Sequence, residues 1–559
     1  MRLLTLTFGF FLAQISSLAC TNILINNAAT IDGSSLITYV ADSHSLYGEL
    51  YFRPAKDYKP GTLMEIYEWD VENLIKGSKY LGKIKQAIHT YSVIGNMNEH
   101  QLAIGETTYG GRPELVDTTA LIDYGSLMYI ALQRAKTARA AIDTIANLIN
   151  EYGYYSSGES FSISDPNEVW IMEIIGKGSP EIKKDKKGKV IGKKYNKGAV
   201  WVARRLPEGY VCAHANQSRI RQFPLHDNIN CIYAKDVITF ARDKGWFNGK
   251  DEDFSFADTY APLTFEAVRF CEARVYSIFR RIAPSLNLSD SFIKGEENAE
   301  PMPLWVKPDK KLSLQDVFSL MRDHYEGTDL DMTNDIGAGP YKCPYRWRPL
   351  TWKVDSIEYF NERAISTQQT GFSFIAQSRS WLPDFVGGVL WFGLDDTYST
   401  VYVPMYCSMT DVPKEYLQGN GDLLNYSETS AFWTFNYVSN MAYTRYSDMI
   451  VDIQKVQKEL ESKFLTFQPV VEKAAIELNN SGKTDFAQRF LNEYSISQSE
   501  TTVNHWKNLG HRLLVKYLDG NVKSDDGRVL HPAYPNYFYK SIIQQTGEKL
   551  KMKKIKGEK

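Results

Sequence analysis

Cys20 and the residues before it form the pattern in this chain with the clearest chemical meaning. Residues 1–19 contain an early cation, an apolar stretch, and small residues at Ser17 and Ala19. Small residues at these two places are typical of a signal-peptidase site. Cleavage after Ala19 would leave a thiol and a free α-amine together on Cys20. Because an α-amine has an ordinary pKa of about 7.7–8.0, it can take the proton of its own thiol, so Cys20 is a candidate nucleophile with a built-in base.

Two other interpretations of Cys20 stay open. A lipoprotein signal also ends just before a cysteine, although it usually carries an aliphatic residue where this chain has Ser17. Acylation of the amine would also remove the base. The second alternative is a buried structural cysteine near an ordinary mature N-terminus.

A nucleophile of this kind needs a group that orients the amine, donors for the developing oxyanion, and groups that bind the substrate. Asp42 is the candidate for orienting the amine, and Asn216 is the candidate side-chain donor to an oxyanion. Glu106 is a candidate for binding the substrate. The other candidates for substrate binding are Thr107, Thr108, Tyr109, Arg219 and Arg274.

The elements around these residues are predicted to be β-hairpins. Residues 21–39 read as two strands around Asp32-Gly33, a strong hairpin signal. Residues 88–109 give two more strands around a polar turn at residues 96–100. The segments SFSISD, EVWIMEII, AVWVARRL and GYVCAHAN add further strand candidates. Cys20 is therefore expected at the start of a strand, with Asp42 just past the end of its hairpin partner.

Helices are predicted in two places. Alanine-rich and leucine-rich periodicity indicates one or two helices over residues 126–152, and apolar residues at spacings of three and four indicate helices over 446–491. Between about 340 and 440, aromatics with Pro and Gly punctuation indicate strands and loops. The predicted fold is α+β, with stacked sheets and helices outside them. We expect a signal peptide at 1–19, a catalytic domain at 20–445 and a helical region at 446–559.

Composition narrows the class of protein. The chain of 559 residues has 43% hydrophobic and 13% aromatic content, which is typical of a folded globular protein. Its formal net charge of −2 gives no reason to expect nucleic acid as a partner. After residues 1–19, no segment approaches the roughly 20 apolar residues that a membrane span needs. The product is therefore expected to be exported, either in the periplasm or outside the cell, and an assembly of identical chains is compatible with the sequence.

The other cysteines of the chain do not form a recognisable chemical site. The five later cysteines, Cys212, Cys231, Cys271, Cys343 and Cys407, show no CxxC spacing, so they indicate no zinc site, and their disulfide pairing is not specified. The pair Cys212 and His214 falls on one face of a strand, with nothing nearby to complete a papain-like site.

Charged runs are explained more simply as solvated surface. The basic stretch at residues 183–194 reads as the tip of a hairpin, and the tail from Lys549 as a solvated end. Residues 329–335 (DLDMTND) have calcium-loop spacing, but Asn334 and Pro340 stand where an EF-hand requires Gly and Glu, so a cation there is left open. No cofactor or metal is expected to take part in the chemistry.

Several strings together resemble one family. They are CTNILINNAATIDGSSLITYVADS, NEHQLAIGETTYGGR, GESFSISDPNEVWIMEIIG, AHANQSRI, CEARVYSIFRR, DMTNDIGAGPY, RPLTW, STQQTGFSFIAQSRSWLPD and VLWFGLDDTY. As a set they cover most of residues 20–450 and resemble the dipeptidase A/secernin family. Members of this family are cysteine-type N-terminal-nucleophile hydrolases, distantly similar to penicillin V acylase and bile salt hydrolase.

The resemblance implies a four-layer αββα sandwich with the first residue at the end of a central strand. It implies that Cys20 is nucleophile and base, that Asp42 is the family's aspartate, and that Asn216 is the oxyanion-hole asparagine. A second oxyanion donor would come from Thr108 or Tyr109. One departure is Tyr39, which stands where an arginine commonly lies, three residues before the aspartate, and Arg274 is a candidate substitute.

The function implied is hydrolysis of short peptides, chiefly dipeptides, outside the cytoplasm through an acyl-enzyme on Cys20. Two alternatives remain at this level. One is an acylase of the penicillin or bile-salt type on the same fold. The other is a lipid-anchored peptide-binding protein whose cysteine is acylated.

Overall fold

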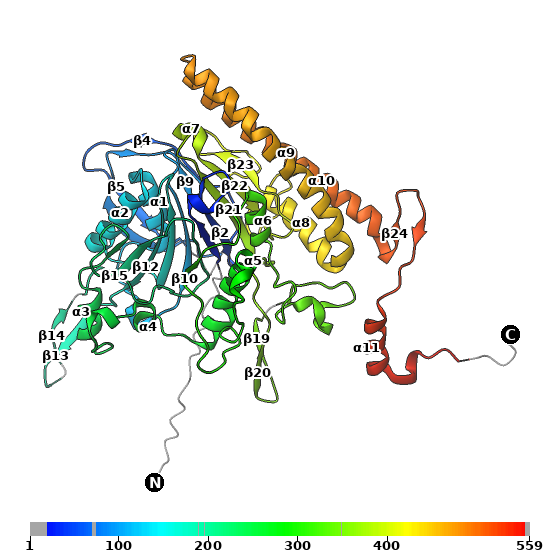
Figure 1. Ribbon diagram of the computed structural model, residues 1–559, viewed down its shortest axis with the longest axis horizontal. Helices are drawn as coiled ribbons and strands as arrows, with labels where there is room; N and C mark the ends of the chain where they lie inside the picture. Colours follow the sequence, from blue (N-terminus) through cyan, green and yellow to red (C-terminus); the bar gives the residue numbers. More distant parts are fainter. Residues whose placement is uncertain (1–19, 70–73, 188, 195, 348, 554–559) are drawn as a thin grey trace, which may run out of the picture.

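The computed structural model describes residues 20–69, 74–187, 189–194, 196–347 and 349–553. The predicted signal peptide at 1–19 lies outside the described residues. Mixed α and β structure is observed, with antiparallel sheets and a helical C-terminal region (Figure 1).

A seven-stranded antiparallel sheet carries the start of the described chain at its centre. Its strands, in spatial order, are β18 (Trp305–Val306), β16 (Val211–His214), β1 (Asn22–Ile25), β2 (Ser35–Asp42), β21 (Thr370–Ser378), β22 (Val389–Leu394) and β23 (Val403–Tyr406). The predicted first hairpin is confirmed, because β1 pairs with β2 and Gly33 takes the positive φ of 82° that the turn needs. Asp42 is the last residue of β2 and does not lie beyond it.

The second large sheet has eight strands. In order they are β17 (Cys231–Tyr233), β15 (Ala199–Arg205), β12 (Val169–Gly176), β11 (Gly158–Ser164), β10 (Ala103–Tyr109), β9 (Met97–Asn98), β8 (Val93–Ile94) and β3 (Phe52–Arg53). The expected strand over residues 88–95 is broken into short pieces, because the chain turns already at Gly95, whose φ is 51°.

The two sheets pack face to face, with β2 of one against β10 and β11 of the other. Every residue of β1, β2, β11 and β12 is buried, as expected of strands that are covered on both sides. Helices α1 (Tyr124–Arg134) and α2 (Ala138–Tyr152) pack against the eight-stranded sheet, and this confirms the predicted helices. Asp123 caps α1 by accepting from the Ser126 backbone N–H.

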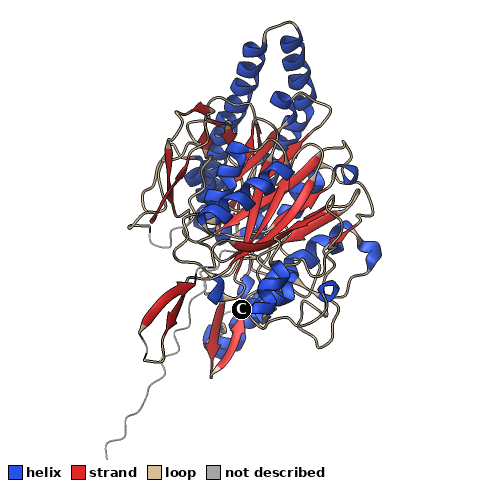
Figure 2. Cartoon of the chain, turned by 90° about the vertical axis from the view of Figure 1, so that its left-hand side faces the viewer, coloured by secondary structure: helices blue, strands red, loops and turns tan. Residues whose placement is uncertain are grey.

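Three C-terminal helices cover the seven-stranded sheet: α8 (Ala431–Thr444), α9 (Tyr446–Asn480) and α10 (Thr484–Tyr517). The last two form a long hairpin whose tip stands out from the sheets (Figure 2). The hairpin is attached through its buried face, where Trp506 of α10 stacks on Phe435 of α8 with ring centroids 5.0 Å apart. The sequence interpretation placed strands and loops up to residue 440, so α8 was not anticipated.

Further helices lie at the ends of the sheets and in the tail. They are α3 (Val237–Asp243), α4 (Phe256–Tyr260), a π-helix (Ala267–Glu272), α5 (Ala273–Ile282), α6 (Leu314–Met321), α7 (Asp384–Gly387) and α11 (Asn536–Thr546). The small hairpins are β4 (Lys56–Asp57) with β7 (His89–Thr90), β5 (Leu63–Tyr67) with β6 (Tyr80–Lys85), β13 (Glu181–Lys184) with β14 (Val190–Lys194), β19 (Thr351–Val354) with β20 (Ile357–Phe360), and β24 (Val522–Lys523) with β25 (Val529–Leu530). The basic stretch at 183–194 thus forms part of a hairpin, as predicted.

The structure also shows the surroundings of the cysteines and of the calcium-like segment at residues 329–335. Within the described ranges, none of the helices combines the length and apolar character of a membrane span. All six cysteines are free thiols. The carboxylates of the calcium-like segment are used locally: Asp331 caps a 3₁₀ turn, Asp329 pairs with Lys294 at 3.0 Å, and Asp335 pairs with Arg346 at 2.6 Å.

Candidate active site

A cavity of about 230 Å³ opens beside Cys20. Its polar wall contains Cys20, Asp42 and Glu106, and these are three of the residues that the sequence analysis selected. The remaining wall is rich in aromatic rings. The aromatic lining residues are Tyr39, Tyr47, Tyr51, Trp69, Tyr124 and Phe372.

The Cys20 thiol lies between two oxygen atoms. Its Sγ is 3.8 Å from the hydroxyl of Tyr39 and 3.8 Å from Oε1 of Glu106, and the Tyr39 hydroxyl donates to the same Oε1. Burial, followed by the carboxyl groups of Glu106 and Asp42, raises the pKa of the Cys20 thiol well above its usual value. The backbone N–H of Asp42 and the Tyr39 hydroxyl act in the opposite direction.

Tyr39 is held rigidly. Its ring meets the rings of Phe372 and Phe374 edge-on, with both centroid distances at 5.7 Å. Both phenylalanines lie on β21, which pairs with β2 along its length. The hydroxyl of Tyr39 is therefore fixed in place between the thiol and Glu106.

Asp42 is buried at the end of β2. Arg363 Nη2 lies 2.9 Å from its Oδ2, and the Thr370 hydroxyl donates to its Oδ1 at 2.6 Å. Burial raises the pKa of Asp42, while Arg363 and Thr370 oppose that rise. The carboxylate is therefore satisfied by side chains from later in the chain, and its backbone N–H faces the thiol.

Arg274 reaches Cys20 from α5. Its Nη1 donates to the Cys20 carbonyl at 2.6 Å and to the Thr21 hydroxyl at 2.8 Å, and its Nη2 donates to Asn216 Oδ1 at 2.9 Å. The side chain is fully buried. Arg274 thus contacts the backbone of Cys20, whereas the side chains of Tyr39 and Glu106 approach the thiol.

Asn216 follows β16 with a left-handed φ of 59°, a conformation that asparagine tolerates better than most residues. Its Nδ2 donates to the Thr108 carbonyl at 2.7 Å. With Arg274 on its Oδ1, the amide orientation is fixed from both ends. An amide nitrogen has two hydrogens, so one donor of Asn216 is not used by Thr108.

A second carboxyl group lies behind Glu106. Glu159 is on the neighbouring strand β11, directly opposite Thr108, and its Oε2 accepts from the Thr108 hydroxyl at 2.9 Å. Its side chain also hydrogen-bonds Glu106. A closed ring of contacts therefore begins and ends at Cys20. In order, it passes through Cys20, Tyr39, Glu106, Glu159, Thr108, Asn216, Arg274 and back to Cys20.

The sequence is similar to that of known proteins. The model of peptidase family C69 matches residues 19–459. The chain belongs to peptidase family C69. It is therefore a hydrolase of peptide bonds, and the matched range begins next to Cys20.

Three relatives show how far the sequence of this chain has diverged from other dipeptidase-like proteins. A probable dipeptidase of Latilactobacillus sakei is 23% identical over 460 residues, which cover 80% of this chain and 86% of the relative. A probable dipeptidase of Salmonella dublin is 25% identical over 412 residues, covering 70% and 82% respectively. A probable dipeptidase B of Streptococcus pyogenes serotype M1 is 22% identical over 525 residues, covering 90% and 94%.

Of the six predicted substrate-binding residues of this C69 peptidase, only Glu106 is among those lining the cavity, and Asn216 is not among them either. Thr108, Arg274 and Asn216 belong instead to the ring of contacts around Cys20.

Thr107 points between the sheets, where its hydroxyl is 2.7 Å from His214 Nδ1. The Tyr109 hydroxyl donates to the Ile174 carbonyl at 2.9 Å. Arg219 pairs with buried Glu272 at 2.9 Å and donates to backbone carbonyls of other segments. The hydrogen-bonding groups of Thr107, Tyr109 and Arg219 are therefore already used in contacts within the protein.

Several residues of the site were not selected from the sequence. Arg363 and Glu159 are the main ones, and Tyr39 was noted only as a departure from the resemblance. Glu159 does lie in a string that carries the resemblance, GESFSISDPNEVWIMEIIG, which was its one available signal. Arg363 lies 321 positions from its partner Asp42, and no local pattern marks it.

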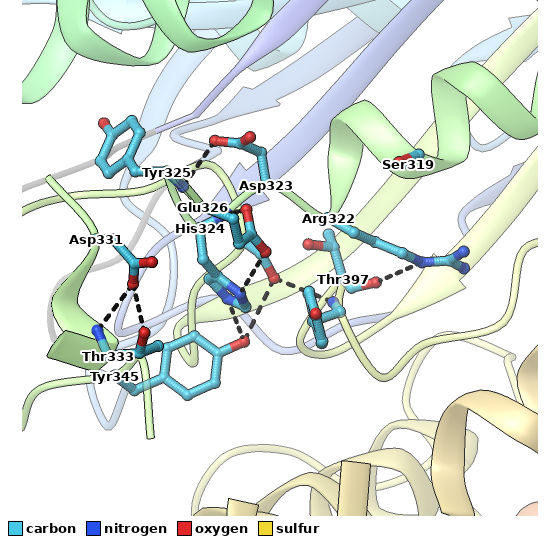
Figure 3. A network of polar contacts seen from close by, with 12 residues as sticks. Ser319, Arg322, Asp323, His324, Tyr325, Glu326, Asp331, Thr333, Tyr345 and Thr397 are labelled. Atoms are coloured by element: carbon cyan, nitrogen blue, oxygen red, sulfur yellow. Dashed lines mark hydrogen bonds and ion pairs between the residues drawn. The ribbon is translucent and has the colours of Figure 1, made fainter. Parts of the chain in front are cut away.

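A larger cavity of about 500 Å³ lies between α5, α6 and α9. Its arginines are largely neutralised, because Arg322 pairs with Glu461 at 2.5 Å and Arg281 pairs with Asp323 at 2.9 Å. Figure 3 shows the polar network on one side of it, where Arg322 also donates to the Thr397 carbonyl. Peptide-bond hydrolysis needs a nucleophile, so the smaller cavity that holds Cys20 is the better candidate for the active site.

Proposed function

We propose that this C69 peptidase is an exported cysteine-type dipeptidase, and that its two facing sheets with outer helices represent the four-layer N-terminal-nucleophile hydrolase fold. The observation that carries the proposal is the Cys20 thiol in the cavity wall, 3.8 Å from both Tyr39 and Glu106. The cleavage pattern at Ser17 and Ala19 and the dipeptidase names of the relatives support it.

In the proposed mechanism the α-amine of the mature Cys20 takes the thiol proton. The sulfur then attacks the scissile carbonyl carbon, and the amine returns the proton to the leaving amine of the peptide. Water hydrolyses the resulting thioester and regenerates the thiol. While residues 1–19 are attached, no free amine is present and burial keeps the thiol protonated. Signal removal places a titratable cation beside the sulfur and so favours the thiolate.

The Nδ2 hydrogen of Asn216 that does not go to the Thr108 carbonyl is the proposed donor to the tetrahedral oxyanion. Such a donor is typically worth about 3–4 kcal/mol in the transition state. The hydroxyls of Thr108 and Tyr109 already donate within the protein, so a second donor from this strand would have to be a backbone group. Arg274 fixes both Asn216 and the Cys20 carbonyl and is a positioning residue in this scheme.

Glu106 is the proposed partner of the substrate's ammonium group, because it is a carboxyl group in the cavity wall next to the nucleophile. Replacing Glu106 with Gln should raise KM for free dipeptides and leave KM for N-acylated amides unchanged. Equal effects on both substrate classes would refute the assignment. The same comparison tests the acylase alternative, which requires a preference for the acylated amides.

The central experiment combines N-terminal analysis of the exported protein with dipeptide assays. Intact mass should show a chain that begins at Cys20 with an unmodified amine. Cys20→Ala should abolish hydrolysis, and Cys20→Ser should retain only a small fraction of it. A mature chain that begins elsewhere, or that carries fatty acid on its amine while still cleaving dipeptides, would overturn the proposal.

A further inference from the structure

Glu106 and Glu159 form a pair of buried carboxyl groups beside the nucleophile. They lie on neighbouring strands, with Glu159 opposite Thr108 and Glu106 two residues earlier on the same face of β10. Diagonal neighbours of this kind are within reach of long side chains. Glu106 is 1% exposed and Glu159 is 0% exposed. Glu106 lines the cavity, whereas Glu159 stands behind it.

Two carboxyl groups in contact at a buried place are not expected to be ionised together. Burial, followed by the charge of Glu106, raises the pKa of Glu159 well above its usual value, while the Thr108 hydroxyl and the Ser160 backbone N–H oppose that rise. Glu106 accepts from the Tyr39 hydroxyl and lies next to the Cys20 thiol. In the resting state that this inference assumes, the proton of the pair is on Glu159 and the negative charge is on Glu106, which accepts from Tyr39.

The tyrosines around the pair add no charge to it. Tyr109 and Tyr154 interact electrostatically with Glu159, and the Tyr39 hydroxyl donates to Glu106. Burial raises the pKa of Tyr39 well above its usual value. Burial raises the pKa of Tyr109 and of Tyr154 well above the usual value, so these phenols stay neutral near pH 7. The pair is therefore a site in which an entering cation can replace a proton.

We propose that Glu106 and Glu159 form a two-carboxyl site for the α-ammonium group of a peptide, and that ammonium binding at Glu106 releases the proton held by Glu159. The inference rests on the proposed dipeptidase function. No covalent bond of the substrate changes in this step: the ammonium keeps its three protons, and Glu159 loses one proton to solvent. The pair then carries two negative charges and the ammonium one positive charge, so the pair with its bound ammonium has the charge of −1 that the empty pair had. The α-amine of the mature Cys20 is not included in this count.

Glu159 acts through Glu106 and is a positioning residue, whereas Glu106 contacts the substrate. The exchange explains how a buried site can admit a cation at little electrostatic cost, since a second carboxylate charge appears only when the ammonium is present. It also sets the substrate class. A free terminal amine is required, and an N-acylated peptide cannot drive the exchange.

The test measures protons released when an intact dipeptide binds to the Cys20→Ala enzyme. Isothermal titration calorimetry at pH 7 in two buffers of different ionisation enthalpy gives that number. Release should approach about one proton per dipeptide in Cys20→Ala and fall to near zero in Cys20→Ala with Glu159→Gln, because the introduced amide mimics the protonated acid but cannot release a proton. Both proteins retain the N-terminal amine, so any proton from that amine appears equally in both. The N-acetylated dipeptide serves as the ligand control.

A second measurement does not depend on the folding of the Glu159 variant. In Cys20→Ala itself, Kd for the dipeptide should rise about tenfold for each pH unit of acidification below the pKa of the pair, because proton and ammonium compete. A Kd that is flat with pH, or equal proton release with and without Glu159→Gln, overturns the exchange and leaves the dipeptidase assignment standing. Failure of wild-type enzyme to hydrolyse dipeptides, together with failure of Cys20→Ala to bind them, overturns both.

Discussion

The guanidinium group of Arg274 hydrogen-bonds both Asn216 and Cys20: its Nη2 donates to Asn216 Oδ1 at 2.9 Å and its Nη1 donates to the Cys20 carbonyl at 2.6 Å. The proposed oxyanion donor and the proposed nucleophile are therefore fixed relative to each other by one planar group. A guanidinium is suited to this because its donors are rigidly arranged. In the proposed mechanism, the precision of the site thus depends on a residue that acts through its neighbours.

Arg274→Lys should lower kcat/KM for dipeptides about 100-fold, because an ammonium cannot maintain both contacts and small misplacements near reacting groups are costly. Steady-state kinetics should show the loss mainly in kcat, since the proposed contact of Glu106 with the substrate's ammonium group is kept. Arg219→Lys is the matched control, a similarly buried arginine whose partners include Glu272 and backbone carbonyls. The assignment is contradicted if the two variants lose the same activity per folded molecule.

Tyr39→Phe should raise the pKa of the Cys20 thiol, because the Tyr39 hydroxyl, which donates to Glu106 while the sulfur is protonated, can turn its one proton to the thiolate. A hydrogen bond to a charged group is worth about 1.5–3 kcal/mol, so we expect a rise of roughly 1–2 pKa units and a loss of about 10–100-fold in kcat. The rate of iodoacetamide alkylation as a function of pH measures the thiol directly.

Tyr47→Phe is the control for Tyr39→Phe. Tyr47 also lines the cavity, but its hydroxyl lies 2.5 Å from that of Ser430. Its loss should leave the alkylation profile unchanged. An unchanged profile for Tyr39→Phe would show that the hydroxyl near the thiol has no part in setting its reactivity.

The hairpin that follows Cys20 was predictable because its signal is local, and the prediction that Cys20 is the nucleophile also rests on a local signal. The proposed cleavage pattern at Ser17 and Ala19 points to Cys20, and Asp32-Gly33 marks the turn that pairs β1 with β2. Glu159 and Arg363 were not predictable in the same way, since each meets its partner only through long-range packing. Nothing in the sequence around Arg363 indicates that it reaches Asp42.

Helix α8 was also not predictable from the sequence, because its local propensity does not favour a helix. Its sequence AFWTFNYVSNMAYT is rich in aromatic and β-branched residues, which favour strands when considered alone. Burial against the sheet decides the outcome, with Ser430 capping the first turn by accepting from the Trp433 backbone N–H. The local propensity is overridden by tertiary packing.

Retention of residues 1–19 should keep the enzyme inactive. Ala19→Leu places a large residue where signal peptidase needs a small one, so the uncleaved protein should show below about 1% of the mature activity in a dipeptide assay. Ala19→Gly keeps the residue small and should be processed and active. Full activity in a protein whose intact mass still includes the leader would contradict the proposed role of the Cys20 amine.

His214 should make the protein sensitive to acid. Its ring is 2.7 Å from both the Thr107 and the Ser162 hydroxyl, and burial lowers its pKa to about 3. Below pH 6.5 the unfolded chain takes up a proton that the folded chain does not, so the free energy of unfolding falls as the pH falls from 6.5 towards 3. Between pH 7 and pH 5 this one residue should cost about 2 kcal/mol.

The measurement is urea unfolding of wild type and His214→Gln at both pH values. Glutamine does not titrate, so the variant is less stable at pH 7 but should lose about 2 kcal/mol less than wild type on going to pH 5. His324 is buried with a pKa lowered to about 3 as well, and His324→Gln should reduce the same acid loss independently. Equal acid losses in wild type and His214→Gln would mean that His214 is protonated in the folded protein, and its hydroxyl partners would then both have to accept from the ring.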